Sequence, residues 1–370
     1  MPETDHPTDA PSRAGPPIWA LMAEKPGDNA QIEAVANAAG LPWQRRTVVV
    51  QEQWRLAKPP IAVDISHIDA AAGDPLEPPW PDMVITAGRR LFNVALWIKA
   101  RSPATRLVLV GRPHGRFEAC DLIVAAPQFR LPPRDNVVNL SLPLLFPAAD
   151  RIAAEAEKWR AELAGMARPL TAVLVGAQTQ PFRFAPDDAR RMMRLIATTN
   201  AGAGSLFVTT SRRTPPAVAE AIAASLSPAD RLFRWQADAA RNPYLALLGL
   251  ADRFVVTGDS ASMLTEVARL GRPLAICELP PDPRPSLWPQ HLARALGAAL
   301  HRLAGEEGAR AILQRLRLGG SRDLTALHRK LYAMGRAVKL GQPYPAPAPA
   351  GLDDELARVA SRIRQLLPPR

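Results

Sequence analysis

One short stretch of the sequence combines residue types that bind phosphate and sugar hydroxyl groups. An apolar run ends at Gly258, a small polar segment follows, and a helical pattern begins near Ser260. Glycine allows a tight turn and a close approach of the backbone to a ligand. The free N–H groups of a first helical turn form an anion site. Because Asp259, Ser260 and Ser262 also suit helix capping, a simple cap and a phosphate site both stay open.

Glu266, one turn into that helix, does not fit the standard capping pattern. A capping box needs Glu or Gln three residues after the cap, and the residues there are Met or Thr. Glu266 shares a helix face with Ser262, where its carboxylate can accept hydrogen bonds from a ribose diol. In the alternative, Ser260 caps the helix and Asp259 complements its dipole. Glu266 then pairs with Arg269 on a solvated face.

Further candidates follow other apolar runs in the second half of the chain. Arg212 and Arg213 come after a predicted strand, and the planar fork of arginine matches the oxygens of a diphosphate. An ordinary basic loop is the alternative. Gly176 and Gln178 lie in the first loop of this half, which lacks the dinucleotide fingerprint of three glycines. Asn242 precedes a predicted helix, where it either faces a nucleotide base or only starts the helix.

The first half offers candidates for acid–base chemistry. Asp28 follows the first predicted strand and can act as a general base toward an acceptor hydroxyl, or simply complete a turn and cap. Arg89 and Arg90 follow another strand and suit an anion on either the donor or the acceptor. His114 lies just past a strand end and is the best-placed histidine, with His67 second, although a loop histidine is also an ordinary surface residue.

Several chemistries are excluded by motif. The chain has no phosphate-binding loop of the Walker A type and no nucleophile elbow around a serine. No cysteine and histidine cluster has the spacing of a zinc site. We therefore expect no metal and no cofactor, with a nucleotide-diphosphate sugar entering only as a substrate.

Short apolar strands alternate with helical segments along most of the chain. Typical strands are 18–22, 47–50, 83–86 and 106–111, and the pattern restarts with a strand at 171–177 after a charged helix. Continuous apolar strands separated by helices indicate a parallel sheet covered on both faces. The sequence predicts an α/β protein with two Rossmann-like domains facing each other across a cleft. Ligands of such sheets bind at the carboxyl ends of the strands.

The same pattern predicts five segments along the chain. They are a disordered tail (1–17), an N-terminal Rossmann-like domain (18–165), a C-terminal Rossmann-like domain (166–340), a proline-rich linker (341–352) and a terminal helix (353–370).

The composition restricts the partners. The chain has 370 residues and a formal net charge of +11, and residues 281–370 hold 15 Lys and Arg against 7 Asp and Glu. Such an excess permits an acidic partner, although a solvated basic helix face gives the same count. No RNA-binding signature with interleaved aromatic residues is present, so nucleic acid is not expected as a partner.

The expected location is the cytoplasm. The first 17 residues lack the basic start and apolar core of a signal peptide, and no segment has 18 uninterrupted apolar residues. Cys120 and Cys277 lie in apolar contexts and are expected to be buried free thiols, which suits a reducing compartment. The basic C-terminal region would allow peripheral binding to the anionic inner membrane.

Five sequence blocks together resemble a known family, that of the plant "elongated mitochondria" fission factor and its bacterial relatives. They occur in family order from about residue 18 to 280 and read KPGDNAQ, ITAGRR, TSRRTP, NPYLALLGLAD and VVTGDSASMLTEVA. The resemblance implies a fold like that of GT-B glycosyltransferases. It also implies that Gly258, Asp259, Ser260 and Glu266 hold the phosphates and ribose of a nucleotide sugar, while the two arginines of TSRRTP stabilise the departing diphosphate.

The resemblance implies two functions. One is a metal-independent glycosyltransferase for cell-envelope glycan synthesis, with the acceptor, a lipid-linked molecule or a glycan, on domain 18–165 and the donor on domain 166–340. The other is a non-catalytic adaptor that binds a protein or membrane partner, since the plant members are discussed as recruiting a dynamin-like protein. A sugar epimerase fits less well. The sequence departs from the family at Gln128–Arg130, where a His-Asp pair is common, and at Ala177, where a second glycine is usual.

Overall fold

The computed structural model describes residues 17–56, 59, 61–176, 182–200, 202–236, 241–282, 322–349 and 354–367. The predicted tail up to residue 16, the candidate Gln178, most of the basic stretch after 282, and part of the proline-rich linker lie outside these residues.

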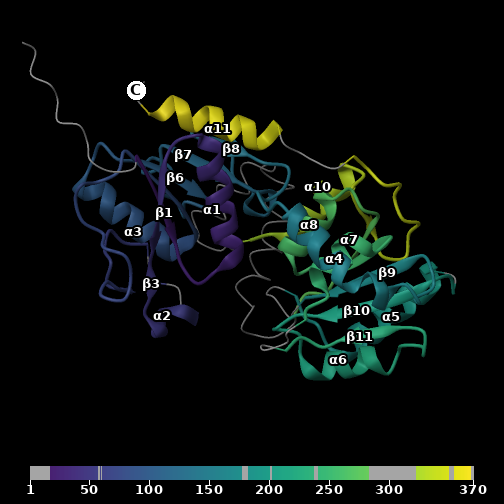
Figure 1. Cartoon of the computed structure of the whole chain (residues 1–370). Helices are drawn as coiled ribbons and strands as arrows, with labels where there is room; N and C mark the ends of the chain where they lie inside the picture. Colours follow the sequence, from purple (N-terminus) through teal and green to yellow (C-terminus); the bar gives the residue numbers. More distant parts are fainter. Residues whose placement is uncertain are drawn as a thin grey trace, which may run out of the picture. The chain divides into compact units, whose positions relative to one another are not determined.

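The first sheet collects the strands of the N-terminal half (Figure 1). Its order is β2-β1-β5-β6-β7-β8, and the printed pairs among the first five are parallel. The strands are β1 (Ile18–Met22), β2 (Trp43–Thr47), β5 (Met83–Ala87), β6 (Arg106–Val110), β7 (Leu122–Ala125) and β8 (Val137–Asn139). Strands β3 (Val49–Val50) and β4 (Ile68–Asp69) form a small antiparallel pair. The helices are α1 (Pro26–Ala39), α2 (Glu52–Leu56) and α3 (Gly88–Arg101).

The second sheet has the order β11-β10-β9-β12-β13-β14, with parallel pairing throughout. Its strands are β9 (Leu170–Val175), β10 (Ser205–Thr210), β11 (Arg231–Phe233), β12 (Arg253–Thr257), β13 (Leu274–Cys277) and β14 (Val338–Lys339). The accompanying helices are α4 (Ala149–Leu163), α5 (Pro186–Asn200), α6 (Pro216–Ala223), α7 (Tyr244–Leu250), α8 (Ala261–Arg269) and α10 (Leu324–Ala333).

Both faces of the second sheet are covered, because alternate side chains of β9 enter two different apolar clusters. Leu170, Ala172 and Leu174 pack with residues of α4, α7, α8 and α10. Val173 and Val175 pack with residues of α5 and α6 on the other face. This two-sided burial is what makes the strands continuously apolar in sequence, and it confirms the predicted α/β class with two Rossmann-like parallel sheets.

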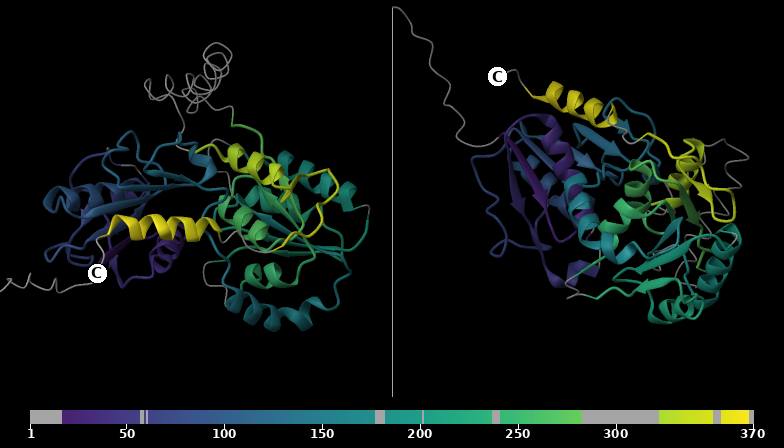
Figure 2. Two further views of the ribbon diagram at one scale, coloured as in Figure 1. Left: turned by 90° about the horizontal axis from the view of Figure 1, so that it is seen from above. Right: turned by 45° about the vertical axis from the view of Figure 1, so that its right-hand side comes forward.

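The chain divides into two compact units by its internal contacts. The first unit contains the described residues up to Val124 and those from Leu356 onward, and the second unit contains Ala125–Glu355. The terminal helix α11 (Asp354–Leu366) buries Val359, Ala360 and Ile363. Within the first unit it runs beside α1, where Arg364 donates to the carbonyl of Ala38 at 3.4 Å (Figures 1 and 2).

Each sheet has one point at which the strand order reverses. The chain continues from β1 to β2 on one side and later adds β5 on the other side, and the second sheet repeats this with β10 and β12 around β9. Ligands of open parallel sheets bind beyond the strand ends at such a point. The loops after β1 and β5, and those after β9 and β12, are therefore where sites are expected.

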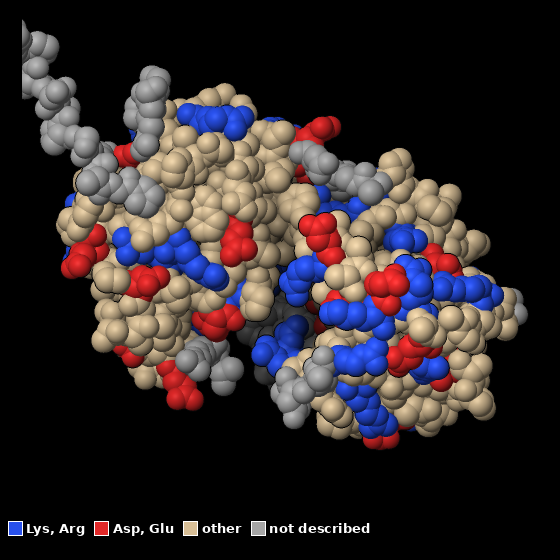
Figure 3. Space-filling view, viewed as in Figure 1, with Lys and Arg blue, Asp and Glu red and all other residues tan. Residues whose placement is uncertain are grey.

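The described surface mixes charges of both signs. Figure 3 shows Lys and Arg side chains lying among acidic ones over the second unit. Exposed ion pairs of this unit include Arg190–Asp187 and Arg234–Glu220. Exposed ion pairs contribute little to stability and are typical of a solvated surface. Among the described helices, none is long and apolar enough to cross a membrane.

Candidate functional site

The order reversal of the second sheet brings the loops after β9 and β12 into contact. The N–H of Gly176 donates to Oγ1 of Thr257 at 2.8 Å. The carboxylate of the buried Asp259 lies so close to Gly176 that a Cβ there would be 2.5 Å from Oδ1. Glycine is therefore needed at position 176 because the carboxylate of Asp259 packs against it. The sequence did not predict this contact.

The loop after β10 is tied to the same place. The hydroxyls of Ser211 and Thr214 donate to the carbonyl oxygen of Gly176 at 2.9 and 2.6 Å, and Thr214 also accepts from the N–H of Ser211 at 2.9 Å. Arg212 and Arg213 lie between these two anchors, and both are exposed. The structure thus places the two predicted arginines on a fixed turn at the carboxyl edge of the sheet.

Helix α8 begins at the order reversal without a side-chain cap. Ser260 is at the N-cap position, but its side chain makes no capping hydrogen bond, and its Oγ lies 3.4 Å from Oγ of Ser262. The first turn also holds no acidic residue. The alternative in which Ser260 caps the helix is therefore wrong, and the backbone N–H groups of this turn have the geometry that binds an anion.

Glu266 is partly buried and has a specific partner. The hydroxyl of Tyr244, the first residue of α7, donates to Oε2 of Glu266 at 2.5 Å. Burial raises the pKa of the Glu266 carboxyl, and burial together with the neighbouring carboxylate raises the pKa of Tyr244. Arg269 is buried too, and it donates to the carbonyl of Pro143 at 2.9 Å. The expected alternative of a solvated Glu266–Arg269 pair is therefore wrong.

Asn242 acts at the start of α7. Its Oδ1 accepts a hydrogen bond from the N–H of Tyr244 at 3.0 Å, while the residue itself is exposed. This bond satisfies one of the free N–H groups at the helix start and fixes the residue that holds Glu266.

Two residues of this region were missed from the sequence, Tyr244 and His328. Tyr244 lies within one of the matching sequence blocks, but its partner is on another helix. His328, on α10, is 2% exposed, and its Nε2 lies 2.7 Å from the carbonyl oxygen of Gly258. A Cβ at Gly258 would come within 2.6 Å of the histidine ring. Gly258 therefore admits this ring, and nothing near His328 in the sequence marks its role.

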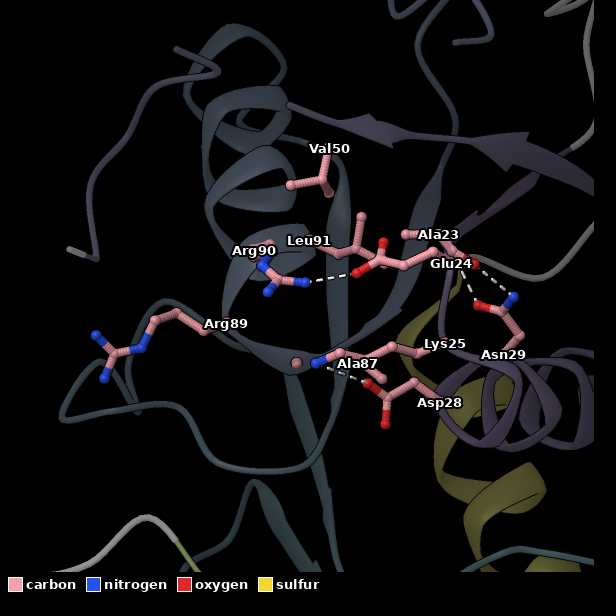
Figure 4. Close-up of a pocket in the computed structure, with 11 residues that line it drawn as sticks. Ala23, Glu24, Lys25, Asp28, Asn29, Val50, Ala87, Arg89, Arg90 and Leu91 are labelled. Carbon is pink, nitrogen blue, oxygen red and sulfur yellow. Dashed lines mark hydrogen bonds and ion pairs between the residues drawn. The ribbon is translucent and has the colours of Figure 1, made fainter. Parts of the chain in front are cut away.

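A pocket lies at the order reversal of the first sheet, between the ends of β1 and β5 (Figure 4). Arg90 and Glu24 form an ion pair in it at 2.5 Å, and Lys25 lies 3.9 Å from Asp28. The side chain of Asn29 binds the N–H and the carbonyl of Ala23 at 3.2 and 2.7 Å and so fixes the loop after β1. The pocket is lined by Ala23, Glu24, Lys25, Asp28, Asn29, Val50, Ala87, Gly88, Arg89, Arg90 and Leu91.

Asp28 faces the start of α3 across this pocket. Gly88 has a φ of +76°, and a Cβ there would lie 3.3 Å from Oδ2 of Asp28. Helix α3 has no side-chain cap and no acidic residue in its first turn. The carboxylate of Asp28 thus lies near the positive end of the α3 dipole.

The two candidate histidines of the first unit lie elsewhere. His114 is not among the pocket-lining residues; its Nδ1 lies 3.3 Å from Arg89, whose side chain points away from Asp28 (Figure 4). His67 is 1% exposed, and its Nε2 lies 2.9 Å from the carbonyl oxygen of Arg90. The structure therefore places Asp28 in the pocket, His114 outside it, and His67 behind the first turn of α3.

The described part of the chain contains no group of three or more His, Cys, Asp or Glu side chains arranged to hold a metal ion. Cys120 and Cys277 are buried free thiols, as predicted. Burial raises the pKa of each thiol to about 12, so both stay protonated at neutral pH.

Residues 26–302 match the sequence model of the family described as Mitochondrial fission ELM1. The chain is 27% identical over 241 residues to the mitochondrial fission protein ELM1 of Arabidopsis thaliana, a match covering 58% of this chain and 56% of that protein. The chain thus spans about half the length of this relative. It is also 26% identical over 293 residues to an uncharacterized protein of Rickettsia prowazekii, covering 70% of this chain and 82% of that protein.

Among solved structures, the chain is similar to a UDP-glucosyltransferase from Polygonum tinctorium, solved in complex with 3,4-dichloroaniline. The TM-score is 0.47 with 9% sequence identity, over 96% of this chain and 99% of that one.

Proposed function

The chain belongs to the Mitochondrial fission ELM1 family, and we propose that it is a metal-independent glycosyltransferase whose second unit binds a nucleotide-diphosphate sugar. The observation that carries this proposal is the partly buried Tyr244–Glu266 pair, which lies one turn after the start of α8, at the order reversal of the sheet. A partly buried carboxyl whose pKa is raised is typical of functional sites.

The phosphates of the donor would lie at the start of α8. The first-turn N–H groups would donate to phosphate oxygens, since the side chain of the N-cap residue Ser260 does not bind them. Arg212 and Arg213, on their anchored turn, would approach the same diphosphate. These charges stabilise the leaving group, which is the role that a metal ion has in other transferases.

The ribose of the donor would lie against Glu266. Tyr244 holds Oε2 and so orients the carboxyl group, and Oε1 would accept a hydrogen bond from a ribose hydroxyl. The ribose would also offset part of the burial that raises the pKa of Glu266, because a hydrogen bond donated to the ionised carboxylate favours that form. Nucleotide binding is therefore expected to make this carboxyl more acidic.

The acceptor would bind at the pocket of the first unit. Asp28 would take the proton of the acceptor hydroxyl, and the oxygen of that hydroxyl would form the new bond to the anomeric carbon of the sugar. The bond from that carbon to the diphosphate oxygen breaks, and the diphosphate leaves with the electron pair. Lys25 and Arg90 line the same pocket and would suit an acceptor that carries an anionic group, such as a lipid-linked phosphate.

A second function, a non-catalytic adaptor, is favoured by one observation. The stretch at which the sequence departs from the family pattern has a structural role: Arg130 forms an ion pair with Asp323 at 3.2 Å, and the carbonyl of Gln128 accepts from the N–H of Asp323 at 2.7 Å. An adaptor would bind its protein or membrane partner without turning over a nucleotide sugar.

Thermal unfolding with a panel of UDP-, GDP-, ADP- and CMP-linked sugars tests the proposal. A ligand at 100 times its dissociation constant should stabilise the protein by about 2.7 kcal/mol. Glu266→Gln should abolish the shift. Glu278→Gln is the matched control, because Glu278 accepts from a tyrosine hydroxyl in the same unit, that of Tyr332 at 3.0 Å.

Three outcomes are informative. A shift with one nucleotide that Glu266→Gln removes and Glu278→Gln keeps supports a donor site at α8. A shift that survives Glu266→Gln places the nucleotide elsewhere. If no member of the panel shifts the unfolding temperature, the transferase proposal fails and the adaptor function is favoured.

A further inference from the structure

His328 contacts the turn before α8 from a distant part of the chain. Its ring is almost fully buried, and Nε2 lies 2.7 Å from the carbonyl oxygen of Gly258. A carbonyl oxygen only accepts, so Nε2 carries the hydrogen and donates. The stretch that matches the family ends at residue 302, before His328.

Both backbone polar groups of Gly258 are hydrogen-bonded. Its N–H donates to the carbonyl of Cys277 at 2.8 Å, and its own carbonyl accepts from His328. The histidine ring is fixed by stacking on Phe182, with centroids 6.4 Å apart and planes 15° from parallel. The absence of a side chain at Gly258 is what lets the ring come this close. The two residues that follow are Asp259 and the N-cap Ser260, so their backbone direction depends on this anchor.

Helix α10, which carries His328, is itself braced at its start. Asp323 is the N-cap and accepts from the N–H of Thr325 at 3.1 Å. The same residue pairs with Arg130 at 3.2 Å, and its N–H donates to the carbonyl of Gln128 at 2.7 Å. Gln128 belongs to the short helix η1 (Pro127–Phe129). His328 is therefore presented to Gly258 from a fixed helix.

We propose that His328 is a positioning residue for the phosphate site: through its hydrogen bond to Gly258 it sets the direction of the turn at 258–260 and so aims the first N–H groups of α8 at the ligand. This inference rests on the proposed donor site at α8. His328 itself touches no ligand atom in this scheme.

Two substitutions separate this role from simple packing. His328→Gln places an amide nitrogen where Nε2 stood, so it keeps the donor to Gly258. His328→Asn is polar as well, but its amide is one carbon shorter and does not reach the carbonyl. The probe is UDP, with GDP, ADP and CMP in parallel, and the readout is the dissociation constant from isothermal titration calorimetry. We expect His328→Asn to weaken binding about tenfold and His328→Gln less than about threefold.

Asn200→Ala is the matched control for loss of a buried polar group. Asn200 is buried in the same unit and donates to Oγ1 of Thr171 at 3.3 Å, at the amino end of β9 and away from the α8 turn. We expect this variant to be less stable than the wild type but to bind UDP with unchanged affinity. A loss of affinity in Asn200→Ala equal to that in His328→Asn would overturn the positioning role.

The two proposals fail in different ways. If the wild type binds none of the four nucleotides, the donor site fails and this inference fails with it. If the wild type binds and His328→Asn binds equally well, only the positioning role is overturned. Hydrogen exchange at the N–H groups of residues 259–263 gives a second readout without a ligand: faster exchange in His328→Asn than in His328→Gln supports the role, and equal exchange opposes it.

Discussion

At the scale of single residues, the carboxyl of Glu266 makes stability depend on pH in an unusual direction. Burial raises its pKa, so the folded protein holds this proton more tightly than the unfolded chain. Its contribution to the free energy of unfolding is fully present below the unfolded pKa and is lost as the pH rises through the folded pKa. Urea denaturation of the wild type and Glu266→Gln between about pH 4 and pH 8 should show this decline only in the wild type. Parallel profiles would contradict it.

For His328 we expect the opposite dependence of stability on pH. Burial lowers its pKa, against the opposing effects of the Gly258 carbonyl, Glu278 and Asp323, while Arg329 acts in the same direction as burial. The unfolded chain then binds the proton more tightly, so stability is complete above the unfolded pKa and falls as the pH drops toward the folded pKa. The difference in unfolding free energy between wild type and His328→Gln should shrink as the solution is acidified below about pH 6.5. A constant difference would show that His328 does not titrate.

The contact between Gly176 and Asp259 gives a third test. An alanine Cβ at 176 would lie 2.5 Å from a buried carboxylate oxygen, so the carboxylate has to move. We expect Gly176→Ala to lower the free energy of unfolding by about 1–3 kcal/mol. Gly165→Ala is the control, since a Cβ there meets nothing within 4 Å. Equal urea midpoints for the two variants would show that the Gly176 loop adapts without cost.

At the scale of elements, the sequence predicted those strands that are buried on both faces. β1, β5 and β9 are fully buried, which makes their sequences continuously apolar. The edge strand was missed for the opposite reason. The apolar run 47–50 predicted a strand, whereas the sheet uses β2, a polar segment ending at Thr47, and Val49–Val50 belongs to the small β3–β4 pair. An edge strand has one neighbour and is partly exposed, so it carries no apolar pattern.

The candidate site was predictable only where it depends on local pattern. The helix start at Ser260 and the exposed pair Arg212 and Arg213 follow from glycine, serine and arginine at strand ends. The partners of Glu266 and Gly258 could not be predicted. Tyr244 on α7 binds Glu266 on α8, and His328 binds Gly258 from 70 residues away in the sequence. Such contacts depend on the packing of distant elements, and sequence spacing does not encode them.

At the scale of the whole molecule, α11 contributes to the first unit although it follows the second in sequence. Ile363 is fully buried on its apolar face. We expect Ile363→Ala to cost about 2–5 kcal/mol, with faster hydrogen exchange in the first unit than in the second. Ser361→Ala, on the exposed face of the same helix, is the control and should leave exchange unchanged. Equally accelerated exchange in both units would show that they unfold together.

The division of the chain also has a consequence for biosynthesis. The second unit is one continuous segment, while the first unit is completed only by residues from Leu356 onward. Domains generally fold as units while the chain emerges from the ribosome. The second unit can therefore fold while α1 still lacks the neighbour that α11 provides. A translational pause or premature stop before residue 354 would leave a folded second unit attached to an incomplete first unit. The surface that α11 covers would then be open to chaperones or proteases.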